Sequence, residues 1–309
     1  MFKESYNNKR YYTLDHFYKK TFGCKVFKVS INGGFSCPNK DGRLSYEGCI
    51  YCSKSGSGEN GGNVKEDLIT QFNNIKAIIS KKWPNSKQIA YFQANSNTYD
   101  TVENLKKRYE LFVGMKDVVG INIATRSDCI TNEVLDYLDD LNKRTCLTIE
   151  LGLQTIHEST SKLINRCHTL ENFTTMVKLL NDRNIKVLVH IINGLPYETK
   201  EMMLDTVKYL NTLGIWGIKI HMLHIIKDTK LHRLYLKKPF KILSLEEYTS
   251  IVCEQIELLD ENIVVNRITS DPDVNMLIEP NWLVKKFCVM NEVDKKMARE
   301  NSYQGIKKD

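Results

Sequence analysis

Polar and apolar positions follow two patterns that alternate along most of this chain. Short segments such as Lys25–Ile31 have the pattern of a strand, and longer segments with apolar residues every three to four positions predict helices. The predicted strands are Lys25–Ile31, Gln88–Gln93, Val118–Ala124, Thr145–Leu151, Lys186–Ile192 and Gly217–Leu223. The predicted helices are about Lys65–Lys82, Thr101–Met115, Thr131–Lys143, Leu170–Arg183 and Lys200–Leu213.

This repeat predicts an α/β fold. Strands that are each followed by a crossover form a parallel sheet, and we expect the sheet to curl into a partial (β/α)6 barrel similar to a TIM barrel. In such barrels the chemistry takes place at the carboxyl ends of the strands. The polar residues that follow each strand are therefore the candidate site.

The pattern changes beyond Leu243. A helix is predicted near Leu245–Leu259, Ile263–Arg267 is compatible with one more strand, and a last helix covers about Trp282–Asn301. We therefore expect three parts, which are a basic aromatic N-terminal segment over 1–24, a barrel over 25–243, and a helical C-terminal extension over 244–309 that packs on the barrel.

The composition changes this picture little. The chain has 309 residues, of which 42% are hydrophobic and 26% are charged, as in ordinary globular enzymes. No apolar run approaches the roughly 18 residues needed to cross a bilayer, and the first residues lack a signal-peptide pattern. We expect a cytoplasmic protein without a membrane partner. Nine cysteines suit that reducing compartment.

The N-terminal segment is both basic and aromatic. Cations for phosphate beside rings for stacking suit a surface that binds single-stranded nucleic acid, and the net charge of +7 mildly favours a polyanion. The alternative is an amphipathic helix whose rings pack on the body of the protein. The candidate RNA-binding cations are Lys9, Arg10, Lys19 and Lys20.

The loop after the first predicted strand holds three cysteines. Cys49 lies twelve positions after Cys37, and Cys52 completes a CxxC pair with an aromatic residue, Tyr51, before it. A structural zinc site uses four protein ligands, whereas three cysteines leave one iron of a cluster free for a substrate or cofactor. A zinc ribbon completed by Cys24 is the alternative.

This loop, Gly34-Phe35-Ser36-Cys37-Pro38-Asn39-Lys40-Asp41-Gly42 with Gly48-Cys49-Ile50-Tyr51-Cys52, resembles the cluster loop of radical S-adenosylmethionine (radical SAM) enzymes. It is most similar to the branch around the catalytic subunit of Elongator, and within it to the YhcC/YtqA type. The resemblance implies that Cys37, Cys49 and Cys52 hold a [4Fe–4S] cluster whose fourth iron binds the methionine moiety of SAM. It also implies that Tyr51 packs near the adenine.

The resemblance extends to the ends of the first three strands. Gly56, Gly58 and Glu59 stand where the family has a GGE element that meets SAM, although a plain surface loop is an alternative. The second strand ends in a run similar to the family's FQ-x-x-[TS]-N-T-Y, and an Asx-turn is the alternative there. Amides, hydroxyls and a guanidinium at a barrel mouth suggest substrate contacts by Asn95, Asn97, Tyr99 and Arg126.

The fourth strand resembles the ELG-[LV]-Q-[ST]…NRGHT run of the same branch. Glu150 interrupts an apolar strand, where an ionised carboxylate is costly unless it is paired. The family implies that Glu150 and Gln154 lie by SAM and that Arg166 binds the SAM carboxylate; a buried Glu150–Arg166 pair is the alternative. His168 is a candidate substrate contact, and Cys167 replaces the usual glycine.

The fifth and sixth strands complete the candidate site. Asn193 and Gly194 belong to a segment similar to the family's H-x-[IV]-x-GLPGE and are implied to contact SAM, with Tyr197 in place of a glycine. His221 is expected inside the barrel as a substrate contact and His224 at its rim. Because residues i and i+3 of a strand face opposite sides, these histidines are not expected to share a metal.

The resemblance covers about residues 9–285 and implies the activity. The reduced cluster passes an electron to SAM, and the resulting 5′-deoxyadenosyl radical takes a hydrogen atom from the substrate. An electron donor such as flavodoxin or ferredoxin is then a partner. No acetyltransferase domain follows the barrel, so acyl transfer is not expected within this chain.

The expected substrate is tRNA. The Elongator-like branch modifies C5 of the wobble uridine, and the basic character of the chain agrees with an RNA partner. The expected reaction is hydrogen abstraction from the C5 side chain of uridine 34 on the way to 5-aminomethyluridine. The alternatives are a small-molecule or peptide substrate, or a zinc-stapled nucleic-acid-binding module.

Overall fold

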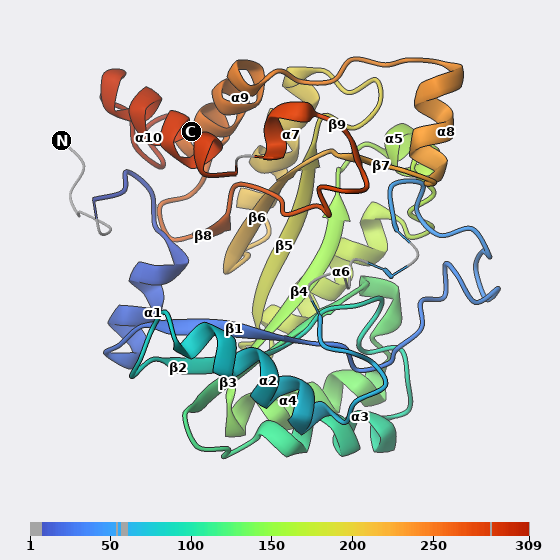
Figure 1. Ribbon diagram of the computed structural model, residues 1–309, viewed down its shortest axis with the longest axis vertical. Coiled ribbons are helices and arrows are strands. Elements are labelled where there is room, and N and C mark those ends of the chain that lie inside the picture. Colours follow the sequence, from blue (N-terminus) through green and yellow to red (C-terminus); the bar gives the residue numbers. More distant parts are fainter. Residues whose placement is uncertain (1–7, 54, 57–60, 285, 309) are drawn as a thin grey trace.

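Seven parallel strands form one curved sheet. The computed structural model describes residues 8–53, 55–56, 61–284 and 286–308, and Figure 1 shows its elements. The sheet has the order β1-β2-β3-β4-β5-β6-β8. Its strands are β1 (Val26–Ile31), β2 (Lys87–Phe92), β3 (Val118–Thr125), β4 (Cys146–Gln154), β5 (Lys186–Asn193), β6 (Gly217–Met222) and β8 (Val264–Arg267). This confirms the predicted α/β curled barrel, and β8 is the further strand at Ile263–Arg267.

The helices begin where the sequence places a side-chain cap. Seven of them start after a threonine, serine or aspartate whose side chain accepts a backbone N–H of the first turn, which satisfies an otherwise unpaired donor. These helices are α1 (Leu14–Phe22), α2 (Leu68–Ser80), α3 (Val102–Tyr109), α4 (Asn132–Arg144), α6 (Leu170–Asn181), α7 (Lys200–Asn211) and α9 (Leu245–Leu258). Thr229 caps α8 (Lys230–Lys237) in the same way. The sequence pattern predicted neither α8 nor the short helix α5 (Glu158–Leu163).

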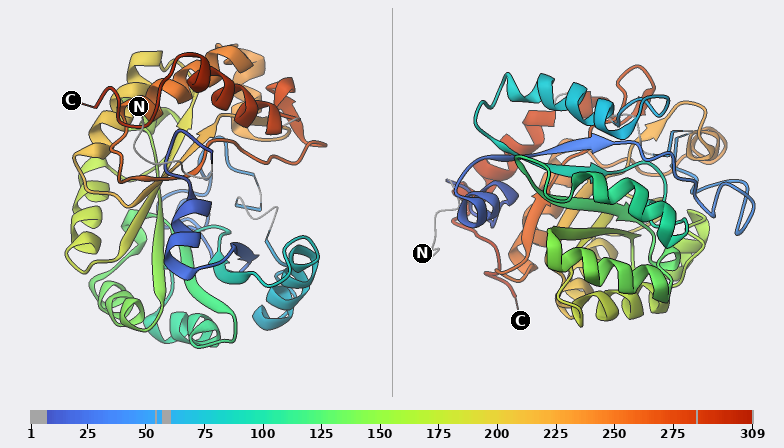
Figure 2. Two further views of the ribbon diagram at one scale, coloured as in Figure 1. Left: turned by 90° about the vertical axis from the view of Figure 1, so that its left-hand side faces the viewer. Right: turned by 90° about the horizontal axis from the view of Figure 1, so that it is seen from below.

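The main core lies between the sheet and the helices that cover its outer face (Figure 2). Phe72 of α2, Leu138 of α4, Val177 of α6 and Val207 of α7 belong to the same buried cluster as strand residues such as Ile149. Apolar strand residues face these helices, so the residues between them face the inside of the barrel because side chains alternate along a strand.

The C-terminal part packs on the barrel through α9. Helix α9 lies between α7 and α10 (Lys286–Arg299), and β7 (Ile225–Ile226) pairs with β9 (Leu277–Glu279) in a small antiparallel sheet. Three residues of α10 are buried, namely Val289, Val293 and Met297, whereas Phe287 is 65% exposed. No helix in the described part of the chain is long and apolar enough to cross a membrane.

The N-terminal segment lies at the amino ends of the strands. Phe17 of α1 packs edge-on against Trp216, which precedes β6, at 4.9 Å between ring centroids, and Thr13 pairs with Val265 of β8. Tyr11 and Tyr18 are buried. This is the arrangement of the alternative reading, an amphipathic helix whose rings pack on the body.

The cations of this segment are therefore far from the strand ends where chemistry is expected. Lys9 pairs with Asp294, and Arg10 donates to the Asn301 side chain and to the Ser302 carbonyl, both at 3.2 Å. Lys19 pairs with Asp15 on its own helix, and Lys20 is exposed on the same helix. This placement does not support the expected RNA contact by Lys9, Arg10, Lys19 and Lys20, because the strands separate them from the site by about 20 Å or more.

The two ends of the chain are joined through Gln304. Its amide donates to the carbonyls of Asp260 (2.7 Å) and Ile263 (2.8 Å), its side-chain oxygen accepts the Tyr12 N–H (2.8 Å), and its own N–H donates to Arg10 (2.9 Å). Gln304 is buried. One side chain thus satisfies three backbone groups that packing has removed from water.

Replacing this side chain should destabilise the whole fold. Gln304→Ala leaves three buried backbone groups without partners and should lower the free energy of unfolding by about 3 kcal/mol. Lys308→Ala is the control, because it removes only an exposed ion pair with Asp260, worth less than about 1 kcal/mol. Urea unfolding measures both. Equal unfolding midpoints would show that Gln304 does not join the termini.

Candidate active site at the carboxyl ends of the strands

The three-cysteine loop leaves the carboxyl end of β1 as a series of tight turns. The carbonyl of Cys37 accepts hydrogen bonds from the N–H groups of Lys40 and Asp41. The carbonyl of Cys49 accepts one from the N–H of Cys52 at 3.0 Å. The Asn165 side chain donates to the Gly48 carbonyl at 2.8 Å. The segment after β4 therefore holds the loop in place.

The three thiols form one electrostatically coupled group. Burial raises the pKa of Cys49 to about 11, the neighbouring thiols of Cys52 and Cys37 also raise it, and Arg126 and a hydrogen bond with Tyr51 lower it. All three cysteines are free of disulfides. The Cys49 thiol, with its raised pKa, needs a bound metal to become a thiolate at neutral pH, so this loop suits a metal centre that displaces its proton.

The donor set fits a [4Fe–4S] cluster better than zinc. In the described part of the chain, no three His, Cys, Asp or Glu side chains are placed to hold one metal ion. A cluster has no such requirement, because each thiolate binds a different iron. Asn39, whose side-chain nitrogen is 3.6 Å from the Cys49 sulfur, adds a hydrogen bond of the kind that tunes such centres.

Cys24 is not part of this group. It precedes β1, whereas Cys37, Cys49 and Cys52 follow it, and six strand residues span about 20 Å. The zinc ribbon completed by Cys24, and with it the zinc-stapled binding module, is therefore wrong.

The expected SAM-binding glycines are described only in part. The Gly56 carbonyl accepts the Asn95 N–H at 3.0 Å, and Gly56 has φ +66°. A Cβ there would lie 2.0 Å from the Asn95 side-chain oxygen, so glycine is required. Gly58 and Glu59 lie outside the described residues, and their expected contacts with SAM stay predictions.

The end of β2 presents unused acceptors. The Asn95 amide donates to the Phe35 carbonyl (3.0 Å) and the Asn97 amide to the Ala124 carbonyl (2.7 Å), while both side-chain oxygens are buried without a hydrogen-bond partner in the described part of the chain. Because neither side-chain oxygen accepts the backbone N–H of a described residue, an Asx-turn does not explain these asparagines. Buried acceptors without partners are costly and indicate a missing donor, such as a bound cofactor or substrate.

Tyr99 lies at the same strand end. Its ring faces the guanidinium of Arg43 at 5.5 Å, which connects it to the cysteine loop. The expected substrate contacts of Asn95, Asn97 and Tyr99 stay predictions.

Arg126 and His168 are already paired within the protein. Arg126 forms a two-pronged ion pair with Asp128, with both distances at 2.8 Å, and donates to the Arg166 carbonyl. The His168 ring nitrogens lie 3.4 Å from the Ser127 hydroxyl and 3.2 Å from the Gly152 carbonyl. Burial, and then the charge of Arg166, lower the pKa of His168 to about 4, so this ring is neutral. Both residues position the loop after β4, and neither offers a free charge to substrate.

Arg166 does not pair with Glu150. The residue is 1% exposed. Its guanidinium donates to the carbonyls of Leu153 (2.8 Å), Thr155 (2.6 Å) and His168 (3.0 Å), with Glu158 at 3.5 Å. The alternative of a Glu150–Arg166 pair is wrong. The expected role at the SAM carboxylate also lacks support, because four of the five N–H groups already have protein acceptors.

Glu150 instead binds side chains from four other strands. Oε1 accepts from Lys28 of β1 and Asn122 of β3, both at 2.7 Å, and Oε2 accepts from His190 of β5 at 2.9 Å and Lys219 of β6 at 2.5 Å. Strands β1 and β4 would lie about 14 Å apart on a flat sheet, so Lys28 reaches Glu150 only across the concave face. The expected contact of Glu150 with SAM is not supported, because both of its oxygens are occupied.

The network is charged despite its burial. Burial alone would raise the pKa of Glu150, but Lys219, Lys28 and the hydrogen bond from His190 hold it well below its usual value. Burial lowers the pKa of Lys219 to about 7 and that of His190 to about 4, against the opposing effect of Glu150. The side chains of Lys28 and His190 remain 16% and 20% exposed and therefore line the interior.

Four members of this network are not among the residues predicted from the sequence. The signal that would have placed them inside the barrel is alternation, because each lies between apolar strand residues that face the helices. The four residues are Lys28, Asn122, His190 and Lys219. His221, expected inside, is there, because its ring lies 5.2 Å from that of His190. Its substrate contact stays a prediction.

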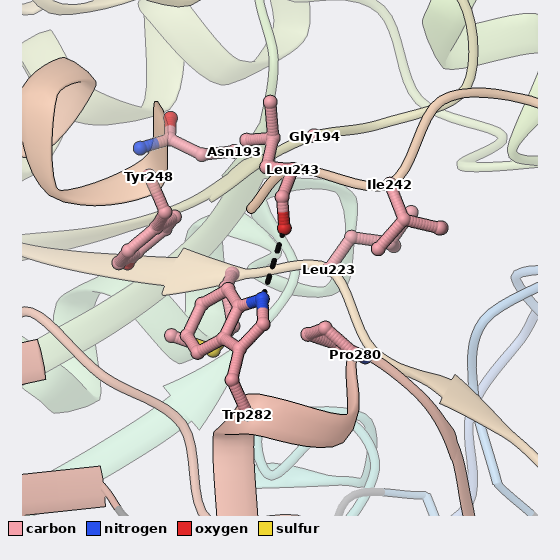
Figure 3. Close-up of a pocket in the computed structure, with 9 residues that line it drawn as sticks. Asn193, Gly194, Leu223, Ile242, Leu243, Tyr248, Pro280 and Trp282 are labelled. Carbon is pink, nitrogen blue, oxygen red and sulfur yellow. Dashed lines mark hydrogen bonds between the residues drawn. The ribbon is translucent and has the colours of Figure 1, made fainter. Parts of the chain in front are cut away.

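The end of β5 borders a small pocket beneath the C-terminal segment (Figure 3). The Asn193 amide exchanges two hydrogen bonds with the Gln255 amide of α9, at 2.8 and 2.9 Å. The expected contact of the Asn193 side chain with SAM is therefore not supported. Gly194 has φ +84° and Leu243 lies against it, and the Trp282 indole N–H donates to the Leu243 carbonyl at 3.0 Å. A SAM contact through the Gly194 backbone stays a prediction.

Three residues at the strand ends hold unfavourable backbone conformations. Among the described residues other than glycine, asparagine and aspartate, a positive φ occurs at Gln154 (69°), Cys167 (63°) and Tyr197 (68°). Gln154 ends β4 beside a register shift, and its expected SAM contact stays a prediction. Cys167 and Tyr197 retain the left-handed turn despite replacing glycine. Such strain concentrates at functional sites.

The Glu150 network yields a test. Glu150→Gln leaves the amines of Lys28 and Lys219 without a counter-charge and should lower the free energy of unfolding at pH 7 by about 3–5 kcal/mol. Because folding depresses the pKa of Glu150, its stabilisation is present above the unfolded value, about 4.3, and disappears as the pH falls through the folded value. Anaerobic urea unfolding should therefore show that the difference in free energy of unfolding between the wild type and Glu150→Gln is smaller at pH 3 than at pH 7.

Glu158→Gln is the matched control, because its side chain is 46% exposed and lies 3.5 Å from Arg166. It should cost less than about 1 kcal/mol. If the difference in free energy of unfolding between the wild type and Glu150→Gln stays constant down to pH 3, Glu150 is not ionised in the folded protein.

Comparison with known proteins agrees with this architecture. Residues 40–210 match the Radical SAM superfamily, and residues 215–299 match the Radical_SAM C-terminal domain. The chain is similar to YtqA of Bacillus subtilis (strain 168), with 46% identity over 98% of this chain and 94% of that protein. It is also similar to a tRNA uridine(34) acetyltransferase of Methanocaldococcus infernus, with 26% identity over 52% of this chain and 30% of that protein.

A solved structure shares the fold. The archaeal Methanocaldococcus infernus Elp3 with an N-terminal deletion superimposes with a TM-score of 0.67 at 18% identity, covering 90% of this chain and 64% of that chain. The family match spans more than half of the chain and includes Cys49, Cys52 and the strand ends up to Tyr197. The chain belongs to the radical SAM superfamily, whose members use a [4Fe–4S] cluster and S-adenosylmethionine.

Proposed function

We propose that this radical SAM enzyme modifies tRNA. It takes a hydrogen atom from the carboxymethylaminomethyl group at C5 of wobble uridine 34. Loss of a second electron to a one-electron acceptor gives an imine, and its hydrolysis breaks the C–N bond, releases the two-carbon fragment as an oxo acid and leaves the aminomethyl group. The observation that carries the proposal is the similarity of half of this chain to a protein named for tRNA uridine(34). The fold shared with the archaeal Elp3 supports it.

The chain's own residues would hold the cofactors at the strand ends. Cys37, Cys49 and Cys52 supply three ligands for the cluster, and the unpaired oxygens of Asn95 and Asn97 are acceptors for SAM or for the substrate. When bound, the cluster and SAM together supply the radical that abstracts hydrogen. The protein contributes placement and the exclusion of water.

The barrel interior suits a substrate that carries a carboxylate. Two lysines, Lys28 and Lys219, face the single carboxylate of Glu150, and Asn122 and His190 are neutral donors. Because burial lowers the pKa of Lys219 to about 7, Lys219 is protonated in part of the molecules at neutral pH, and the interior then carries a net positive charge. The carboxymethylaminomethyl side chain ends in a carboxylate, which such an interior attracts.

Access to the interior favours a base that is free of a duplex. The chemistry lies at the mouth of a curved sheet, and a base stacked inside a helix cannot reach such a site unless it is flipped out. An anticodon base is single-stranded already. A small molecule or a peptide is the rival substrate, and the nucleoside experiment below separates the two.

The ligand assignment can be tested by metal content. Replacing Cys37, Cys49 or Cys52 with alanine should remove most of the iron and sulfide after anaerobic reconstitution, because a three-ligand site cannot lose one ligand. Cys24→Ala is the control, because Cys24 lies at the other end of β1. Iron loss in the Cys24 variant equal to that in the others would reject the assignment.

The substrate can be tested in cells that lack the gene. Mass spectrometry of tRNA nucleosides should show carboxymethylaminomethyluridine accumulating while aminomethyluridine and its products disappear. The wild-type gene should restore the original pattern, and the Cys49→Ala gene should not. Unchanged wobble uridines would reject tRNA modification and leave a small-molecule or peptide substrate.

A further inference from the structure

Helix α8 and the residues after it form a basic surface. Residues 227–241 include six lysines and arginines and one acidic residue, Asp228. Lys230 pairs with Glu47 and Lys241 with Glu247, whereas Arg233 and Lys237 are exposed and have no carboxylate partner in the described part of the chain. A chain with a net charge of +7 thus concentrates much of its positive excess here.

This surface borders the cysteine loop. The N–H of Leu231 in α8 donates to the Ile50 carbonyl, between Cys49 and Cys52, at 2.9 Å. Leu231 and Phe240 share a buried cluster with Ile164 and Leu195, and Ile50 and Tyr51 pack against it. Figure 1 shows α8 beside that loop and on the opposite side of the molecule from α1.

Tyr197 adds an exposed ring to the same surface. It lies in the loop after β5 and is 52% exposed, with the amine of Lys238 over its ring at 5.0 Å and Phe240 against its edge at 6.3 Å. Its φ of +68° is one that a bulky residue rarely adopts. An exposed ring gains little from burial, so packing does not explain a tyrosine in this strained position.

We propose that Tyr197 and the basic surface of α8 together dock the anticodon loop of tRNA. This inference rests on the proposed function and identifies the surface that would deliver the RNA. The Tyr197 ring stacks on an unpaired base next to the target nucleotide, while Arg233, Lys237 and Lys238 contact phosphates. An exposed ring among cations is the arrangement that binds single-stranded RNA, because every base offers a face for stacking.

The position of the surface selects it over the N-terminal segment. Both are basic and aromatic, but the rings of the N-terminal segment are buried and its helix α1 lies at the amino ends of the strands. The α8 surface adjoins the loop expected to hold the cluster. RNA bound there reaches the site of chemistry, and Lys19 and Lys20 on α1 provide a matched control.

The test measures binding of an anticodon stem–loop RNA to the cluster-loaded enzyme by fluorescence anisotropy. Tyr197→Gly should weaken binding about tenfold, the value of one stacked base, while Tyr197→Phe binds like the wild type. Because glycine suits the left-handed backbone, Tyr197→Gly should unfold at a temperature no lower than the wild type. Loss of binding with an unchanged fold and iron content is then a surface effect.

The cations are tested by the salt dependence of binding. A variant with serine at Arg233, Lys237 and Lys238 should weaken binding and reduce the slope of log Kd against log salt by about 2, because three phosphate contacts are lost. A variant with serine at Lys19 and Lys20 should bind like the wild type.

Two further outcomes separate this inference from the proposed function. If the wild type binds the RNA but the Tyr197 and α8 variants bind equally well, the surface is wrong while tRNA modification stands. If a duplex RNA without a loop binds as tightly as the stem–loop, or if Tyr197→Phe binds as weakly as Tyr197→Gly, the stacking role is wrong. Absence of any RNA binding by the wild type, with unchanged wobble uridines in cells lacking the gene, rejects both.

Discussion

The buried carboxylate of Glu150 connects the strands of the barrel from within. It accepts hydrogen bonds from β1, β3, β5 and β6 across the concave face, and these contacts require the sheet to be curved. The carboxylate alone would be costly in this position, and the lysines alone equally so. Together they satisfy one another and leave a polar, positively charged interior between an apolar outer layer and the strand ends.

The strand ends are organised by backbone contacts rather than by free charges. Arg166 is the clearest case, because its guanidinium binds carbonyls of three residues and fixes the segment after β4. The same segment holds the cysteine loop through Asn165. Arg126, Arg166 and His168 look like ligands in the sequence but act as supports here. At the end of β2, the buried side-chain oxygens of Asn95 and Asn97 have no hydrogen-bond partner in the described part of the chain.

The two ends of the barrel have different roles although both are basic. At the amino ends, buried rings, the Gln304 hydrogen bonds and the ion pair of Lys9 join the termini to the body. At the carboxyl ends, α8 presents cations beside an exposed tyrosine and adjoins the cysteine loop. The two surfaces contain the same types of residue, so composition alone cannot tell which of them lies near the site. Their positions in the fold make the difference.

The local features of this protein follow from its amino-acid sequence. Alternation and helical spacing predict the strands and most of the helices, and turn residues indicate the shape of the cysteine loop. The three cysteines and the motifs around them identify the family. All of these features depend on residues that are close together in the chain. The sequence also indicates that Glu150 needs a partner. The folded chain, and not the sequence pattern, identifies the partners as Lys28, Asn122, His190 and Lys219. It also pairs Asn193 with Gln255 and brings one of the two basic segments to the border of the site. These pairs join residues far apart in the chain, and strand order and sheet curvature bring them together.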